Sequence, residues 1–385
     1  MRVDAPDLII PARDAAELSE IASWDGFRPA TFAPSDFPVD VVRFAGSVSP
    51  PVSIARAKRA ETLKALPATL RQRAQTVFEL VARAAPRMPL AHGRSLDLAS
   101  PPLVMGVINV TPDSFSDGGV HFERSRAVES GLAMAEAGAA ILDVGGESTR
   151  PSSYGEAAPV SAEEEIRRTV PVIEELRART ALPISIDTRK ASVAREALSA
   201  GADLVNDVSA LRHDPTMSET VSRAGAGVIL MHMKGHDPRT MQHDTAYAHP
   251  IADIAQELAQ AGGRAIEAGI LPDSICIDPG LGFGKSADGN LVLLRYLAAF
   301  RSLGFPLVVG VSRKAFVRRF SGVGEDATAA ERLPGSLAGL AAAAAGGAAI
   351  VRVHDVADSV RFLRMLRAIA LPAPVAARSA GAAAP

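Results

Sequence analysis

The sequence contains little cysteine, few aromatic residues and almost no net charge. Its 385 residues include one cysteine, so no disulfide can form within the chain. That residue, Cys276, lies in an apolar run and is predicted to be a small buried core residue. The formal net charge of -2 is unlike the broad basic excess of proteins that bind nucleic acids or membrane surfaces. We therefore expect neither partner, and an anionic ligand would need a local cluster of cationic side chains.

Long uncharged apolar runs are also missing. The N-terminus carries acidic residues where a signal peptide needs an apolar core. The Ala-rich stretch near 337–351 is the nearest to a membrane span, but its Ala and Gly predict a packed helix running into a strand. These features predict a cytoplasmic protein. Aromatic residues make up 4% of the chain, so Ala, Val, Leu and Ile must fill most of the core, as in parallel α/β folds.

The chain divides into three zones. Residues 1–94 are predicted to be an N-terminal extension, helix-like and basic over 55–94, and the pattern assigns it no function. Residues 95–371 are predicted to form one domain. Residues 372–385 are rich in Ala and Pro and are predicted to be a disordered tail.

Short β-branched runs alternate with amphipathic stretches throughout the middle zone, which is typical of βα units. Gly138, Gly201 and Gly269 lie where helices should end. With a last helix at 355–370, the pattern predicts an α/β fold of the TIM (β/α)8 barrel type, and a doubly wound sheet is the alternative. The predicted strands are 103–108, 141–144, 184–186, 204–205, 228–231, 275–277, 307–311 and 350–353.

Polar side chains follow nearly every predicted strand. In a TIM barrel the chemistry gathers at these C-terminal strand ends. One set is cationic and suits phosphate oxygens, namely Arg150, Lys314, Arg352 and His354. A second set is rich in acceptors that can read the N–H edge of a nitrogen heterocycle, namely Asp187, Asn206 and Asp278. Helix capping explains Asp and Asn but not the cations, so we expect a substrate with a heterocycle at one end and phosphate at the other.

Eight segments in this zone together resemble the dihydropteroate synthases. The resemblance covers roughly residues 96–365, in the family's order. The segments are MGVINVTPDSFSDGG, DVGGESTRPSS, ISIDTRK, LVNDVSAL, LMHMKG, IDPGLGFGK, VGVSRKAF and RVHDV.

The resemblance implies that 6-hydroxymethyl-7,8-dihydropterin diphosphate is joined to 4-aminobenzoate, giving 7,8-dihydropteroate and diphosphate with Mg²⁺ present. Residues carried over to the pterin are Asp187, Asn206, Met231, Asp278 and Lys314. Those carried over to the diphosphate are Asn109, Thr149, Arg150, Arg352 and His354, with Asn109 also a Mg²⁺ ligand. Those carried over to the aminobenzoate pocket are Phe115, Pro151, Phe283 and Lys314. The residues expected to carry catalysis are Asp187, Lys314, Arg352, His354 and Arg150.

Two segments depart from the family's pattern. Ser152 and Ser153 follow Arg150-Pro151, where a glycine and a small residue are common, and Ala315 follows Lys314 where many members carry serine. The missing hydroxyl leaves a backbone amide or Arg150 to bind the aminobenzoate carboxylate. The resemblance also allows a homodimer.

Two other functions remain open. A methyltetrahydrofolate-dependent methyltransferase shares the pterin-binding barrel, and a non-catalytic pterin-binding paralogue is the second alternative. The cationic set favours the synthase, because a methyl-transfer site has no diphosphate to bind. His232 has no partner at metal-ligand spacing, so we expect it to be a histidine of the core or rim whose hydrogen bonds are satisfied.

Overall fold

The computed structural model describes residues 9–10, 52–53, 87–100, 102–110, 119–148, 159–247 and 249–370. Most of the predicted extension and the whole predicted tail therefore lie outside the described residues. None of the described helices is long and apolar enough to cross a membrane.

Eight parallel strands form the centre of the molecule, in the order β10-β9-β8-β7-β6-β5-β12-β11. A parallel bridge between Ile277 and Leu307 joins the two ends of this sheet, and Ile277 N donates to Pro306 O at 3.0 Å. The predicted TIM barrel is therefore confirmed. The strands are β5 (Leu103–Asn109), β6 (Ile141–Gly145), β7 (Ile184–Asp187), β8 (Leu204–Asp207), β9 (Gly227–Met231), β10 (Ile275–Asp278), β11 (Val308–Gly310) and β12 (Ile350–Val353).

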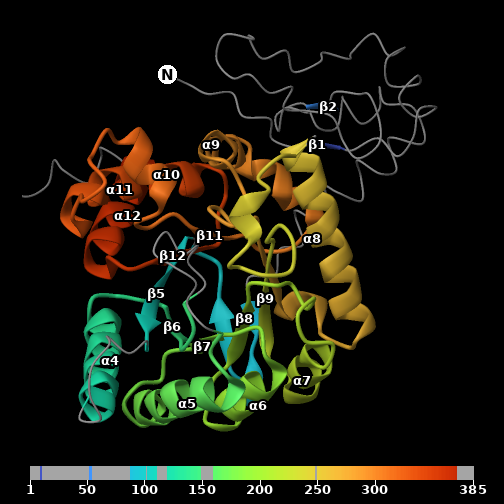
Figure 1. Ribbon diagram of the computed structural model, residues 1–385, viewed down its shortest axis with the longest axis vertical. Coiled ribbons are helices and arrows are strands. Elements are labelled where there is room, and N and C mark those ends of the chain that lie inside the picture. Colours follow the sequence, from blue (N-terminus) through green and yellow to red (C-terminus); the bar gives the residue numbers. More distant parts are fainter. Residues whose placement is uncertain are drawn as a thin grey trace, which may run out of the picture.

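Helices surround the strands on the outside of the barrel (Figure 1). Ser161 caps α5 by accepting from Glu164 N at 3.2 Å, and Thr328 with Glu331 forms a capping box on α11. The helices are α4 (Gly119–Glu136), α5 (Ala162–Arg179), α6 (Ala191–Ser199), α7 (Met217–Ala224), α8 (Pro250–Glu267), α9 (Ala287–Arg295), α10 (Ala315–Phe320), α11 (Ala329–Ala345) and α12 (Val356–Ala370). Short 3-10 helices are η2 (Ala91–Gly93), η3 (Met241–His243), η4 (Pro272–Ser274) and η5 (Leu297–Leu303).

The N-terminal end of the barrel is covered by an antiparallel hairpin of β3 (Arg87–Pro89) and β4 (Ser95–Asp97). This hairpin buries Met88, Leu90 and Leu96 against the first residues of the barrel strands. The three side chains belong to one apolar cluster with Cys276. Cys276 is fully buried, as predicted. The hairpin spans the boundary predicted at residue 94, so residues 87–94 pack on the barrel. A further strand pair, β1 (Ile9–Ile10) with β2 (Val52–Ser53), is antiparallel.

Candidate active site at the C-terminal strand ends

Strand register places several predicted site residues at one level of the barrel. Asn109 of β5 pairs with Gly145 of β6, Gly145 pairs with Asp187 of β7, and Asp187 pairs with Asn206 of β8. Because parallel strands share one direction, these paired residues form a row across four neighbouring strands. The row brings the diphosphate residue Asn109 to the same edge as two pterin residues.

Arg352 of β12 joins the cationic set to the acceptor set. Its Nη2 donates to Asp187 Oδ2 at 2.5 Å, and its Nε donates to Asp143 Oδ2 at 2.6 Å. Asn206 Nδ2 also donates to Asp143 Oδ2, at 3.3 Å. The two predicted sets therefore share one site rather than two separate ones.

Burial changes the acid–base properties of this cluster. Burial raises the pKa of Asp187 to about 7, although the positive charge of Arg352 opposes the shift. Burial likewise raises the pKa of Asp278, against the attraction of Lys314. Asp143 and Asp187 in turn raise the pKa of Arg352 above its usual value, although burial acts against them. The guanidinium therefore stays charged, and Asp187 titrates near neutrality.

Asp278 ends β10 and begins the glycine-rich loop. Its Oδ1 accepts from Gly280 N at 2.7 Å. Gly280 has φ +70°, and a Cβ at this position would lie 1.9 Å from the carbonyl oxygen of His232. Only glycine fits both the conformation and the space.

Lys285 fixes the same loop from its far end. Its side chain is 4% exposed, and its Nζ contacts Gly280 O at 2.8 Å, His232 O at 3.0 Å and His232 Nδ1 at 2.8 Å. Burial lowers the pKa of Lys285 well below its usual value, while Asp278 opposes this. His232 is 1% exposed, so the predicted core or rim histidine is a core one.

Lys314 and Phe283 meet beside this loop. Lys314 Nζ lies 4.9 Å from the centre of the Phe283 ring and also donates to Leu281 O. Phe283 packs against a buried apolar cluster that contains Met231, Val208, Met233 and Met241. Three residues assigned to the pterin and aminobenzoate pockets therefore lie together beside the glycine-rich loop, namely Lys314, Phe283 and Met231.

His354 and Asn109 complete the described part of the site. His354 lies two residues after Arg352, and its Nδ1 is 3.2 Å from Ser312 Oγ. Asn109 is exposed at the end of β5. An exposed amide and an imidazole near Arg352 suit the binding of an oxyanion from solvent.

Comparisons with known proteins agree with this geometry. The family model for pterin-binding enzymes matches residues 105–354. Dihydropteroate synthase from Escherichia coli strain K12 is 45% identical over 278 residues, covering 72% of this chain and 95% of that protein. The chain belongs to the pterin-binding enzymes, among the dihydropteroate synthases.

Other dihydropteroate synthases give the same result. The enzyme from Synechocystis is 43% identical over 282 residues, covering 73% of this chain and 95% of that protein. The structure of the Xanthomonas albilineans enzyme with 4-aminobenzoic acid has 44% identity and a TM-score of 0.67, covering 75% of this chain and 99% of that one. The structure of that enzyme with 7,8-dihydropteroate has 39% identity and a TM-score of 0.64, with 75% and 100% covered.

Sequence reasoning missed two residues of this synthase-like site. Asp143 sits inside the buried strand β6 and is fully buried, and its Oδ1 makes no hydrogen bond to any described residue. The position of this carboxylate inside an apolar strand could have indicated a cationic partner, because buried charges need partners. Lys285 gave no such signal, since a lysine after a glycine-rich loop is normally exposed.

Four predicted site residues lie outside the described residues, namely Phe115, Thr149, Arg150 and Pro151. Ser152 and Ser153 lie outside them as well. Ala315 begins α10 and is exposed beside Lys314.

The Mg²⁺ expected for a dihydropteroate synthase can be tested against the donor groups. Within the described ranges no three His, Cys, Asp or Glu side chains come together as a metal site. Mg²⁺ often takes only one or two protein oxygens and completes its shell with phosphate oxygens and water. The exposed amide of Asn109 fits such a site, in which the substrate supplies most ligands.

Proposed function

We propose that the chain condenses 6-hydroxymethyl-7,8-dihydropterin diphosphate with 4-aminobenzoate, releasing 7,8-dihydropteroate and diphosphate. The observation that carries the proposal is the direct contact between Arg352 and Asp187. This contact places Arg352, the cation proposed for the diphosphate, beside Asp187, the carboxylate proposed for the pterin. The family membership supports the same reaction.

The acceptor set binds the pterin. Asp278 accepts from the amino group and the adjoining ring N–H, since a carboxylate can take two parallel hydrogen bonds. Asn206 binds the next edge, and Lys314 binds the ring carbonyl side. Met231 lies under the ring, in the apolar cluster that also contacts Phe283.

The cationic set binds the diphosphate. Arg352, His354 and Asn109 hold its oxygens, and Thr149 and Arg150 act from the second loop. Mg²⁺, when bound at Asn109, would supply further positive charge to the leaving group. As the bond between the pterin methylene carbon and the diphosphate oxygen breaks, the electron pair leaves with diphosphate, and these groups stabilise its negative charge.

The methylene left behind is cationic and conjugated with the pterin ring. Asp187, as a carboxylate near the ring N–H, stabilises this positive charge. The neutral arylamine then attacks the carbon, forming the new C–N bond, and releases a proton to solvent or diphosphate. The aminobenzoate sits against Phe283, Phe115, Pro151 and Lys314. No protein nucleophile is needed, because an aniline nitrogen is already nucleophilic.

Thermal stabilisation separates this function from the alternatives. A synthase is stabilised by a dihydropterin and also by diphosphate with Mg²⁺, because both bind the folded state. A methyltransferase or a non-catalytic paralogue responds to the pterin alone. A pterin response without any diphosphate response therefore contradicts the proposal. The predicted homodimer and cytoplasmic location stay predictions.

A further inference from the structure

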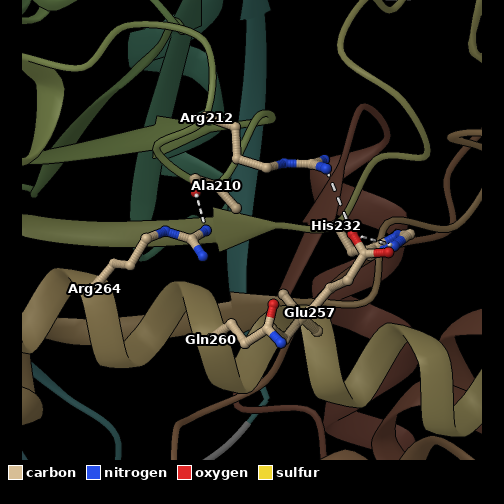
Figure 2. A pocket seen from close by; sticks show the side chains of 7 residues that line it. Ala210, Arg212, His232, Glu257, Gln260 and Arg264 are labelled. Carbon is tan, nitrogen blue, oxygen red and sulfur yellow. Dashed lines mark hydrogen bonds and ion pairs between the residues drawn. The ribbon is translucent and has the colours of Figure 1, made fainter. Parts of the chain in front are cut away.

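A cavity of about 240 Å³ lies beside helix α8, between that helix and the segments that follow β8 and β9 (Figure 2). It is separate from the residues assigned to the proposed reaction. Its lining consists of Ala210, Arg212, His232, Glu257, Leu258, Gln260 and Arg264.

His232 supplies a buried nitrogen without a hydrogen bond to this cavity. The residue is 1% exposed, and its Nε2 has no hydrogen-bond partner in the part of the chain that the structure describes. The carboxylate of Glu257 comes to 3.4 Å from Nε2, which is too long for a good hydrogen bond. Glu257 is therefore a long and weak partner of Nε2, and a ligand oxygen that comes closer would make a stronger hydrogen bond.

The position of Glu257 shows which ring nitrogen carries the proton. Lys285 Nζ lies 2.8 Å from His232 Nδ1 and also contacts two carbonyl oxygens. The carboxylate of Glu257 can only accept, so its approach to 3.4 Å favours the tautomer with the ring proton on Nε2. Burial lowers the pKa of His232 to about 4, with Lys285 adding to the effect, so the ring is neutral. Nε2–H is therefore a donor on the Glu257 side of the ring, and both residues line the cavity (Figure 2).

Two guanidinium groups also line the cavity. Arg212 donates to Ser209 O at 3.0 Å and lies 3.4 Å from Glu257 Oε2. Arg264 extends from α8 on the other side, and its Nη2 lies 3.4 Å from Ala210 O (Figure 2). Two arginines against one glutamate leave the lining with one net positive charge, so a bound monoanion would neutralise it.

We propose that this cavity binds a small oxyanion, a carboxylate or a phosphate. The oxyanion accepts hydrogen bonds from His232 Nε2–H and from the guanidinium groups of Arg212 and Arg264. The amide of Gln260 supplies a further donor from the same helix. This proposal is independent of the proposed catalytic function.

Nuclear magnetic resonance of the full chain labelled with ¹⁵N-histidine tests the proposal. Sodium acetate and sodium phosphate are titrated separately, against equal sodium chloride. His232 is recognised as a neutral Nε2–H ring that does not titrate between about pH 5 and pH 8. We expect a saturable shift of its Nε2 signal, and the anion that saturates it at lower concentration identifies the ligand class.

Matched variants locate the site. Arg264→Gln should weaken binding about tenfold or more, because a charge-assisted hydrogen bond is lost. Arg223→Gln should leave binding unchanged, since Arg223 is an exposed arginine of α7 that pairs with Glu219 and does not line the cavity. The proposal is overturned if His232 shows no saturable shift, or if both variants bind as the wild type does. It is also overturned if only His354 responds, because the anion then sits at the proposed diphosphate residues.

Discussion

Arg352 and Asp187 are 165 positions apart in the sequence, yet Nη2 of the arginine donates to Oδ2 of the aspartate at 2.5 Å. The same guanidinium donates to Asp143 through Nε. One cation on β12 is thus oriented by carboxylates on β6 and β7. This arrangement fixes the direction of a group that, in the proposed reaction, must meet a departing diphosphate.

Asp143 should act as a positioning residue for Arg352. Asp143→Asn keeps the shape of the side chain but removes the charge that orients Nε, so we expect kcat/KM to fall at least about tenfold. Steady-state kinetics with both substrates measures this. Asp273→Asn, a change at an exposed position in η4, should leave the rate unchanged. An unchanged kcat/KM in Asp143→Asn would show that Arg352 does not depend on it.

The rate should depend on pH through Asp187. Its pKa is raised to about 7, chiefly by burial, so the group is protonated and neutral below that pH and negatively charged above it. The charged form is the one that stabilises a cationic pterin. We therefore predict that kcat/KM for the pterin diphosphate rises with pH up to about 7 and then levels off. A flat profile between about pH 5.5 and pH 8 would contradict this role for the carboxylate.

The barrel and most of the described site residues were predictable from sequence, because strand and helix periodicity fixes which residues reach the C-terminal edge. Asn109, Asp187, Asn206, Asp278 and Arg352 lie there for that reason. Periodicity says nothing about contacts between distant strands, however. The link between Arg352 and Asp143 depends on ring closure of the sheet, which brings β12 beside β5 and near β6.

The hairpin at the other end of the barrel was not predicted for a similar reason. Met88 and Leu96 belong to short segments without clear periodicity, and only the open end of a barrel provides the apolar surface that buries them. The burial of Lys285 likewise depends on carbonyl groups from two separate loops. Such long-range complementarity leaves no signature in a single sequence.

Lys285 should contribute strongly to stability. Lys285→Met leaves His232 O without its donor and removes one of the two donors to Gly280 O, which Phe283 N also serves, so we expect the free energy of unfolding to fall by about 2 kcal/mol or more. Urea denaturation measures the change. Lys234→Met is the control, because Lys234 is more exposed and pairs with the exposed Asp244, and it should cost no more than about 1 kcal/mol. Equal losses in the two variants would contradict the role given to Lys285.

Gly280 should tolerate no side chain. Gly280→Ala forces a Cβ against the carbonyl of His232 at a positive φ, so the loop must move away from Asp278. Gly225→Ala is a matched control, since Gly225 has φ +58° but a Cβ added there would meet no described atom within 4 Å. We expect about 1 kcal/mol of destabilisation for Gly225→Ala and a clearly larger loss, with weaker pterin binding, for Gly280→Ala. Calorimetric pterin titration and thermal unfolding of both variants check this, and equal behaviour would contradict it.

Turnover of dihydropterin diphosphate with 4-aminobenzoate by the purified chain tests the central claim most directly. The account predicts formation of dihydropteroate and diphosphate in equal amounts. It also predicts that Arg352→Ala is at least about a hundredfold slower, because a charge-assisted contact to the leaving group is lost. Absence of dihydropteroate from the wild type, or a normal rate in Arg352→Ala, would contradict it.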